Sequence, residues 1–376
     1  MIMLSFDVTP FTTVLKDLDN QLVKIYGKIQ TFSENELLFI HKLAKASMIG
    51  ASTRIENALL TDQEVNWLDT LLETSPHVSA FEENRSLIEN KLSKDRERSY
   101  EEVAGCRQML QILFEQYSQM KPFREADLRG LHYALMSPYS QAGPFIGQYK
   151  VQPNYVVEYN NVTKQSRVVF KTAEAGPITQ AAMSDLISWY GVAIEKEPWP
   201  LAIASEFVFR FLAIHPFQDG NGRLGRGLFM LALLQSNQES MKSIIPLIAI
   251  DRHIEKHKEE YYFTLNRCSD GIYQQDPKQY KIQYFLNFMI KIVKEALGDV
   301  EIYHQHFMNI QKLSEAASII YECFKNYPEM RLTNKKIAEQ TNISKRTIAY
   351  GLNQLLESKL IQKYGQGAGT RYQMTF

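Results

Sequence analysis

One polar, glycine-containing stretch, His215 to Arg226, lies between two strongly apolar segments, residues 201–214 and 228–234. Apolar residues recur at helical spacing on both sides, which predicts a helix, a loop and a second helix that begins near Gly222. A loop at a helix N-terminus presents unpaired backbone N–H groups and the positive end of the helix dipole. The stretch is therefore predicted to bind an anion such as phosphate.

Side chains of the same stretch suit a polyphosphate. Arg223 and Arg226 lie three residues apart on the first turn of the second helix, so both guanidinium groups are expected on roughly one face, within reach of neighbouring phosphates. Asp219 is a hard carboxylate of the kind that binds Mg²⁺. Gly220 and Gly222 have no Cβ atoms that would keep a phosphate at a distance.

His215 titrates near neutrality and is placed to accept a proton from an incoming nucleophile. Taken singly, each of these residues also fits an ordinary glycine turn with a structural histidine and two solvated arginines. The complete set, in this order and spacing, favours a nucleotide site. The stretch matches every specified position of HxFx(D/E)GNGRxxR, and in this it resembles the signature of the Fic family.

The resemblance implies that Mg²⁺ and ATP bind on the loop and that AMP is transferred to a Ser, Thr or Tyr hydroxyl of a target protein or of the chain itself. In that scheme His215 is the base, Asp219 holds the metal, and Phe217 anchors the loop in the core. Asn221 fixes the loop by side-chain hydrogen bonds. The nucleotide-binding residues are then Gly220, Asn221, Gly222, Arg223 and Arg226.

Two related reactions and one function of another class remain as alternatives. Doc-like phosphotransferases have Lys where this chain has Gly222, so the residue favours adenylyl transfer over phosphorylation. Removal of AMP from a target is left open by the sequence. The other class is a nucleotide-sensing, DNA-binding regulator without turnover, although a degenerate signature would have favoured it more.

A second motif lies upstream. Ser52 and Glu56 are four residues apart and share a helix face next to apolar neighbours, which also fits an ordinary amphipathic helix. Beside the signature, Ser52 to Asn57 resembles the inhibitory motif of the family, (S/T)xxxE(G/N). The resemblance implies an inhibitory helix at about residues 50–60 and makes Glu56 the intramolecular partner of Arg226.

Strand-like sequence is predicted at 154–159 and 166–171, joined by a turn at 160–165. By resemblance the hairpin is the flap that covers the site and docks a target segment by strand addition, the alternative being a surface hairpin without function. Just upstream, Gly147 to Lys150 resembles GxYR with Lys in place of Arg, which weakens any bidentate contact there.

Tyr261 and Tyr262 begin a segment that resembles YYxxL, which lies near the nucleotide in the family. Aromatic pairs at this spacing also occur as plain core residues. The two tyrosines are assigned to nucleotide binding with core packing as the alternative.

The last part of the chain is predicted to form a winged helix with its own capped helices. The expected elements are helices at 314–324, 333–340 and 344–357 and a glycine-tipped hairpin at 360–374. From residue 313 to 376 there are nine Lys and Arg and five Asp and Glu, so 9 − 5 = +4. DNA binding led by Lys345 and Arg346 is chemically reasonable, and a protein-interaction module is the alternative.

These features predict a mainly α protein, with a Fic helical bundle, a hairpin flap and a C-terminal winged-helix domain. The expected division is 1–100 for an N-terminal helical region that carries the inhibitory helix, 101–311 for the Fic core with the flap at about 154–171, and 312–376 for the winged helix. Lys+Arg and Asp+Glu are both 42, so net charge gives no general attraction to nucleic acid or membranes.

Three isolated cysteines indicate neither a disulfide framework nor a zinc site, which favours a reducing cytoplasm. The start lacks a signal-peptide pattern and no run of eighteen apolar residues follows, so no membrane association is expected. Whether the chain forms a homodimer, and which target it modifies, are left open by the sequence.

Overall fold

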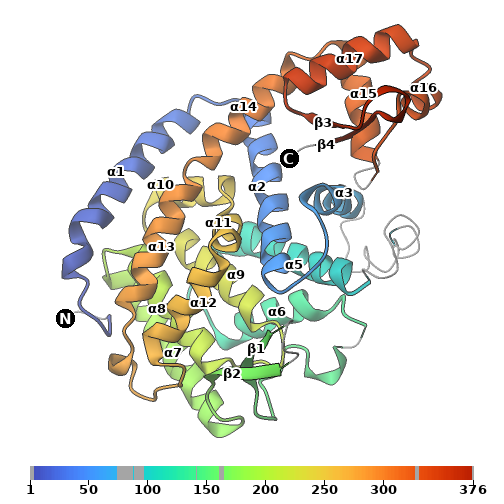
Figure 1. The fold of residues 1–376 in the computed structure, drawn as a ribbon. Coiled ribbons are helices and arrows are strands. Elements are labelled where there is room, and N and C mark those ends of the chain that lie inside the picture. The colour runs from blue at the N-terminus through green and yellow to red at the C-terminus, as the bar shows by residue number, and fades with distance from the viewer. Residues whose placement is uncertain are drawn as a thin grey trace.

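The computed structural model describes residues 4–73, 88, 97–140, 142–160, 165–326 and 330–374. It is mainly helical, as expected, with two small two-stranded sheets (Figure 1). The helices of the main body are α1 Thr12–Ile29, α2 Glu34–Ile55, α3 Asp62–Glu73, α5 Glu97–Gln116, α6 Glu125–Met136, α7 Pro177–Lys196, α8 Pro200–Ile214, α9 Asn221–Leu234, α10 Glu239–Ile244, α11 Ile250–Lys256, α12 Lys258–Ser269, α13 Gln283–Ala296 and α14 Asp299–Gln311.

One buried apolar cluster runs from Leu4 to Tyr303. The N-terminal region and the Fic core, which the sequence analysis separated at residue 100, therefore contribute side chains to the same core. None of the helices in the described part of the chain is long and apolar enough to cross a membrane.

Helices α8 and α9 form the centre of the body and pack against each other. Almost every residue of both is buried, which agrees with their continuously apolar sequences. α8 ends at Ile214, with His215 in the left-handed conformation, and α9 starts at Asn221, with Gly220 as its N-cap. The predicted helix, loop and helix is confirmed, and the second helix begins one residue before Gly222.

α2 crosses the body and packs against α3, α5, α11 and α14. A capping box fixes its start, since the Ser33 hydroxyl accepts from Glu36 N and the Glu36 carboxylate accepts from Ser33 N. Its end is closed by Asn57, whose φ of 74° is left-handed, and by a bond from Ala58 N to Thr53 O. Asn tolerates this conformation better than most residues, which explains its use at the last position of the upstream motif.

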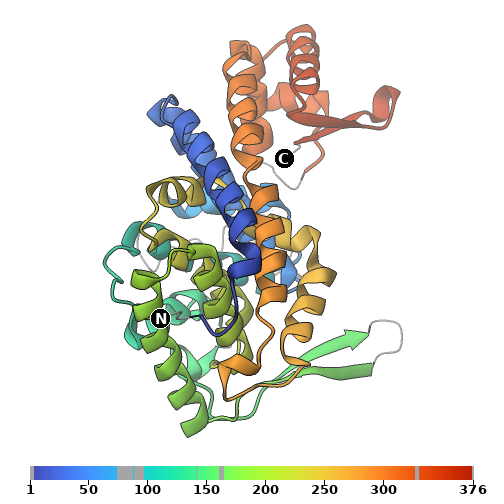
Figure 2. The same ribbon diagram turned by 90° about the vertical axis from the view of Figure 1, so that its left-hand side faces the viewer.

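The predicted hairpin is present. β1 Tyr155–Asn160 and β2 Gln165–Lys171 pair antiparallel, with a register shift between Val156 and Val157, and four residues of the predicted turn lie outside the described residues. Figure 2 shows the hairpin extending away from the helical body.

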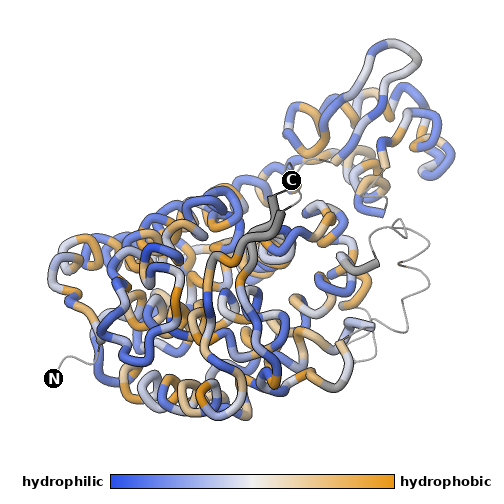
Figure 3. Tube along the Cα trace, turned by 60° about the horizontal axis from the view of Figure 1, so that its bottom comes forward, coloured by the Kyte–Doolittle hydropathy of each residue, from blue (hydrophilic) through white to orange (hydrophobic). Residues whose placement is uncertain are grey.

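The C-terminal unit, residues 313–374, follows α14 and has a second apolar cluster of its own. Its elements are α15 Glu315–Asn326, α16 Asn334–Thr341, α17 Lys345–Glu357, β3 Ile361–Tyr364 and β4 Arg371–Met374. Thr333 and Ser344 cap α16 and α17 through their hydroxyls, as their positions predicted. Figure 3 shows the unit as a lobe beyond the body, with hydrophobic and hydrophilic positions mixed along its helices.

Candidate active site

His215 lies at the junction of α8 and the loop, with a φ of 53°. Its Nδ1 is 3.3 Å from the carbonyl oxygen of Leu212. Because a carbonyl can only accept, Nδ1 carries the proton and the lone pair is on Nε2. Burial lowers the pKa of His215 to about 4, and the nearby Lys150 charge lowers it further, against the effect of the Leu212 bond. The imidazole is neutral at pH 7 and can act as a base.

The loop after His215 is held by side chains on both sides. Asn221 donates to Phe217 O at 2.7 Å and accepts from Phe217 N at 3.0 Å, so the loop closes on itself. His132 of α6 stacks on Phe217 with ring centroids 3.8 Å apart. Its Nδ1 accepts from Gly147 N, so its Nε2 donates to Asp219 O at 3.0 Å.

Sequence reasoning missed His132. Its only sequence signal is a single histidine in an amphipathic helix, which usually marks a core residue. Burial lowers the pKa of His132 to about 4, so the ring stays neutral and keeps its bonds to Gly147 N and Asp219 O at physiological pH.

The two glycines of the loop are required by close packing. Gly220 has a φ of 80°, and a Cβ there would lie 2.9 Å from Met136 Sδ. A Cβ on Gly222 would collide with Oε1 of Glu56 and would lie 3.4 Å from Nη1 of Arg226. Gly222 therefore makes room for a carboxylate of this chain in the present conformation, in addition to the space for phosphate that the sequence predicted.

The first turn of α9 provides donors for an anion. Intrahelical bonding begins with Leu224 N to Gly220 O, which leaves the N–H groups of residues 221–223 without helical acceptors. Nε of Arg223 is buried and lacks a hydrogen-bond partner among the described residues. Asp219 stands at the loop edge with an exposed side chain and is an oxygen donor suited to Mg²⁺. These groups fit a metal-bound polyphosphate.

Arg223 is buried and is held from the α5 and α6 side. Its Nη1 donates to the hydroxyl of Tyr139 at 2.6 Å, and the Glu102 carboxylate is 3.9 Å away. Its Nη2 is 3.4 Å from Asp219 Oδ1. Burial alone would lower the pKa of Arg223, but its anionic and phenolic neighbours raise it, so the guanidinium is charged.

Arg226 is also buried and is held from the α2 side. Its Nε donates to Ser52 Oγ at 2.9 Å and its Nη2 donates to Ser52 O at 2.7 Å. The same Nη2 is 3.0 Å from Oε1 of Glu56, the residue that the resemblance assigned to Arg226 as its partner. Asp251 of α11 lies behind it, with Oδ2 3.8 Å from Nε of Arg226.

Asp251 and Tyr139 were also missed from the sequence, where neither belongs to a motif. Asp251 is almost fully buried, and its Oδ1 lacks a hydrogen-bond partner among the described residues. Burial raises the pKa of Asp251, and the Arg226 guanidinium lowers it. The Asp251 carboxyl is thus a buried neighbour of Arg226, whereas Glu56 is one-third exposed at the end of a helix.

The end of α2 that carries Glu56 is anchored to the body by Arg54. Its guanidinium makes two bonds to Glu255, at 2.7 and 2.9 Å, and an ion pair with Asp62 at 2.7 Å. The backbone at Glu56 is therefore positioned independently of the Glu56 side chain.

Tyr261 and Tyr262 both lie near the pair formed by Arg226 and Glu56. Tyr261 is buried and packs against Phe285 at a centroid distance of 6.2 Å, so it is a core residue as well. Burial raises the pKa of Tyr261 to about 12, and the Arg226 charge opposes the shift. Tyr262 is partly exposed, with its ring 5.3 Å from that of Tyr261.

Comparison with known proteins identifies the family. The model of the Fic/DOC family matches residues 122–233, which include the loop, α8 and all but the last residue of α9. A Fido domain-containing protein from Dictyostelium discoideum is 31% identical over 108 residues, covering 26% of this chain and 72% of that protein. The chain belongs to the Fic/DOC family.

Solved structures of Fic proteins share the fold. A Fic family protein from Desulfovibrio desulfuricans has a TM-score of 0.53 at 19% identity, with 96% of both chains covered. A Fic domain-containing signaling protein from Bacteroides thetaiotaomicron has a TM-score of 0.55 at 21% identity, covering 75% of this chain and 97% of that one. At these identities the likeness concerns the fold alone.

Lys150, the departure from the GxYR pattern, joins the base of the hairpin to the Fic loop. Its ammonium donates to Asn154 Oδ1, Thr172 Oγ1 and Ile214 O, at 2.8, 2.9 and 3.0 Å. Three acceptors use all three N–H groups of an ammonium. Burial lowers the pKa of Lys150 to about 8. Asn154, predicted as a strand residue, precedes β1, and its amide donates to Phe217 O at 2.7 Å.

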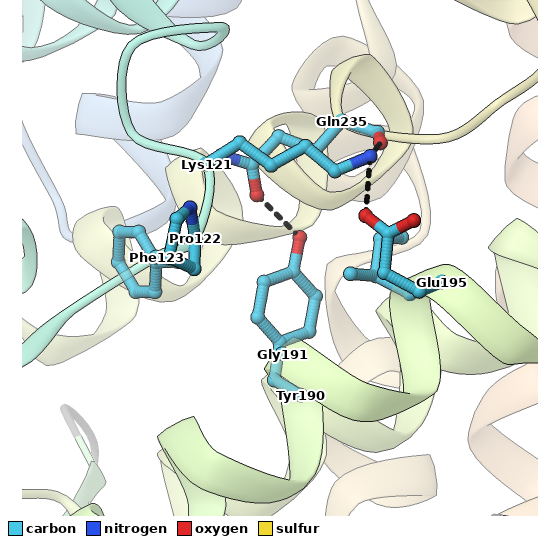
Figure 4. Close-up of a pocket in the computed structure, with 8 residues that line it drawn as sticks. Lys121, Pro122, Phe123, Tyr190, Gly191, Glu195 and Gln235 are labelled. Carbon is cyan, nitrogen blue, oxygen red and sulfur yellow. Dashed lines mark hydrogen bonds and ion pairs between the residues drawn. The ribbon is translucent and has the colours of Figure 1, made fainter.

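A cavity of about 280 Å³ lies at the opposite end of α9 from the Fic loop (Figure 4). Gln235 accepts from the Tyr190 hydroxyl at 2.8 Å, and Lys121 pairs with Glu195 at 2.7 Å across its rim. The polar groups of this cavity bind one another, and none of its lining residues belongs to the signature. We therefore assign the chemistry to the Fic loop.

Proposed function

We propose that this Fic protein is an adenylyltransferase that transfers AMP from ATP to a hydroxyl group of a target protein or of itself, and that Glu56 restrains it. The observation that supports the proposal best is the environment of the His215 imidazole. Its imidazole is neutral, its proton is fixed on Nδ1 by Leu212 O, and its basic Nε2 is beside a loop rich in anion donors.

The chemistry assigns one task to each group. Nε2 of His215 takes the proton of the Ser, Thr or Tyr hydroxyl while its oxygen forms a bond to the α-phosphorus, and the bond from that phosphorus to the bridging oxygen breaks, releasing pyrophosphate. The first-turn N–H groups of α9 bind phosphate oxygens, and Arg223 and Arg226 offset the charge that develops on the leaving group. Asp219 would hold Mg²⁺, which neutralises negative charge on the phosphates.

The flap hairpin is proposed to present the target. Its base is tied to the loop through Lys150 and Asn154, while its strands extend away from the body (Figure 2). Lys171 at the end of β2 already bridges Ile272, so a target segment is expected to add to the β1 edge, which would bring its hydroxyl toward His215. Tyr155 and Val168 are exposed on the strands and offer side-chain contacts for such a segment.

Glu56 is proposed to restrain the reaction through Arg226. The charge-assisted bond of 3.0 Å occupies the guanidinium that should meet a terminal phosphate, and the carboxylate repels that phosphate. Misplacement of the reacting groups by about 1 Å is enough to lower the rate about 10²-fold. The wild-type protein should therefore be slow.

The contacts of Glu56 also bear on two other Fic reactions, phosphotransfer and removal of AMP. Phosphotransfer is disfavoured because Doc-like phosphotransferases have a Lys at the position of Gly222. Oε1 of Glu56 occupies the space beside Gly222, so a lysine side chain there would displace Glu56. Removal of AMP from a target is a second candidate, favoured by the partly exposed carboxylate of Glu56 beside the loop, where it could activate water.

The deciding experiment incubates Glu56→Gly protein with ATP labelled at the α-phosphate and, separately, at the γ-phosphate. Label from the α-phosphate alone in protein is the result expected of an adenylyltransferase. Label from the γ-phosphate would show phosphotransfer instead. Release of AMP from a pre-labelled target by wild type, but not by Glu56→Gln, would show the hydrolytic reaction. No label with either nucleotide would favour a sensor without turnover.

A further inference from the structure

The C-terminal unit carries a concentrated positive charge that the body lacks. Its charge of 9 − 5 = +4 leaves 33 − 37 = −4 for the rest of the chain. Within residues 344–374 there are five Lys and Arg and one acidic residue, Glu357, at the far end of α17. The excess is therefore located on α17 and the following hairpin.

Several of these cations have no ion pair with any described residue. They are Lys345, Arg346, Lys363 and Arg371. Lys345 and Arg346 are exposed in the first turn of α17, and Lys363 and Arg371 are exposed on β3 and β4. Unpaired surface cations remain available to an external polyanion, because no intramolecular partner has to be displaced.

The two faces of α17 differ sharply. Ile348, Leu352 and Leu355 are buried against the core of the unit. The opposite face exposes Lys345, Arg346, Ala349, Tyr350 and Asn353, at helical spacing. Such a face combines cations for phosphates with an amide and a phenol that can hydrogen-bond to base edges.

The composition of the exposed face argues against a protein partner. The core of a protein interface is depleted of charge and rich in large apolar residues. Among the described residues of the unit, Ile319 and Tyr350 are the large apolar side chains exposed most, and Ile319 lies on α15. α17 therefore presents one aromatic ring surrounded by polar and basic groups.

We propose that the exposed face of α17 and the adjoining β3–β4 hairpin bind double-stranded DNA, with α17 in the major groove and the hairpin beside the backbone. The helix has 13 residues and a length of about 20 Å, and its diameter suits a groove about 12 Å wide. Lys345 and Arg346 contact phosphates at one end of the helix, and Lys363 and Arg371 contact them at the hairpin. Bound DNA would tether the Fic body to nucleic acid.

The experiment measures binding of the full-length protein to a fluorescein-labelled 30-base-pair duplex of mixed sequence, by anisotropy, between 50 and 200 mM KCl. Wild type is expected to bind, with affinity falling steeply as salt rises, since each phosphate contact contributes about 0.9 to the slope of log K against log salt. Lys345→Ala/Arg346→Ala should weaken binding and reduce that slope by about 2. Lys363→Ala/Arg371→Ala should also weaken binding, but by less, because the register of β3 and β4 places the two residues on opposite faces of the hairpin.

The matched control is Lys16→Ala/Lys24→Ala, which removes two exposed cations of α1 and should leave binding unchanged. Circular dichroism and AMP transfer by each variant in the Glu56→Gly background check that the fold and the Fic site are intact. The proposal is overturned if wild type does not retain the duplex at 50 mM KCl, or if the α1 control loses as much affinity as the α17 variant. Because AMP transfer is measured separately, failure here leaves the proposed enzyme activity standing, and the converse also holds.

Discussion

Two arginines three residues apart on α9 have environments of different kinds. Arg223 contacts Tyr139 and Glu102, which are themselves part of the buried α5 and α6 region. Arg226 contacts Glu56 at the end of α2 and Asp251 on α11. Arg223 thus contacts Tyr139, Glu102 and the exposed Asp219, whereas Arg226 lies between a buried carboxylate and a partly exposed one.

Glu56 lies closer to Arg226 than Asp251 does, but its carboxylate has the less favourable surroundings. It is the C-cap residue of α2, where the negative end of the helix dipole disfavours an anion by about 0.3–1 kcal/mol. Its side chain is also partly exposed, whereas that of Asp251 is nearly inaccessible. If the proposed restraint by Glu56 holds, control would act through Arg226 while Arg223, one helix turn away, keeps its buried partners.

The largest effect should come from removing the proposed base, His215, whose role does not depend on the difference between the two arginines. His215→Ala in the Glu56→Gly background should lower AMP transfer about 10³-fold while nucleotide affinity stays within about threefold, because the imidazole acts on the hydroxyl and not on the phosphates. The measurement is α-label incorporation together with ATP binding by calorimetry. His304→Ala, far from the loop, is the control, and undiminished transfer by the His215 variant would remove it from the mechanism.

The next largest effect should come from the movable partner of Arg226. Glu56→Gly removes the pairing group and its charge, so AMP incorporation should rise about 10²-fold over wild type at equal ATP. Adding Arg226→Ala should cancel the rise. Glu239→Gly, which also loses a surface ion pair, is the control. Equal rates for wild type and Glu56→Gly would contradict the inhibitory assignment whatever the fate of the other predictions.

Substitution of Asp251, the buried neighbour of Arg226, should affect activity only in the Glu56→Gly background. Asp251→Asn in the Glu56→Gly background should lower kcat/KM for ATP about 30-fold, because it removes one partner of a buried ion pair in which Oδ2 of Asp251 is 3.8 Å from Nε of Arg226. The loss should be in ATP affinity measured by calorimetry as well as in rate. Asp270→Asn, which removes an exposed carboxylate paired with Lys281, is the control. A normal ATP affinity in the Asp251 variant would show that it does not position Arg226.

Removal of the Tyr139 hydroxyl, which binds Arg223, should have a smaller effect on AMP transfer. Tyr139→Phe removes the 2.6 Å bond but leaves Glu102 and Asp219, so AMP transfer in the active background should fall about threefold. Tyr133→Phe, exposed on α6, is the control. A loss as large as that of Asp251→Asn would erase the distinction between the two arginines.

The smallest expected effect is that of pH. Because the pKa of His215 is lowered to about 4, the base stays unprotonated as pH falls from 8 to 6, and kcat/KM of the Glu56→Gly protein should be nearly flat over that range. The loss of kcat/KM should begin only below about pH 5, and circular dichroism checks that the protein stays folded there. An acid limb centred near 6.5, the ordinary value for histidine, would show that His215 is not desolvated in solution.

Much of this protein could be predicted because its signals are local. The helices on either side of the loop, the paired strands near residues 155 and 171, and the hydroxyl caps Thr333 and Ser344 follow from spacing and from side-chain bonds that span a few residues. The order of His215, Asp219 and Arg226 within twelve residues likewise indicated the chemistry before any contact was known.

Other features were decided by packing between distant segments. The contact of Arg226 with Glu56 spans 170 residues, and that of His132 with the loop spans 87. Asp251 and Tyr139 carry no motif, so only their positions reveal what they bind. Position 222 must be glycine because the Glu56 carboxylate, from the end of α2, occupies the space of a Cβ atom there, in addition to any phosphate.

By itself the sequence determined which residues could do chemistry and the helices that carry them, because residue type and periodicity act over one or two helical turns. Only the tertiary structure decided which guanidinium lies between two carboxylates, which acceptors bind the Lys150 ammonium, and that burial lowers the pKa of both His132 and His215. Those properties depend on distances across the core and on exclusion of water. Neither is encoded in the order of neighbouring residues.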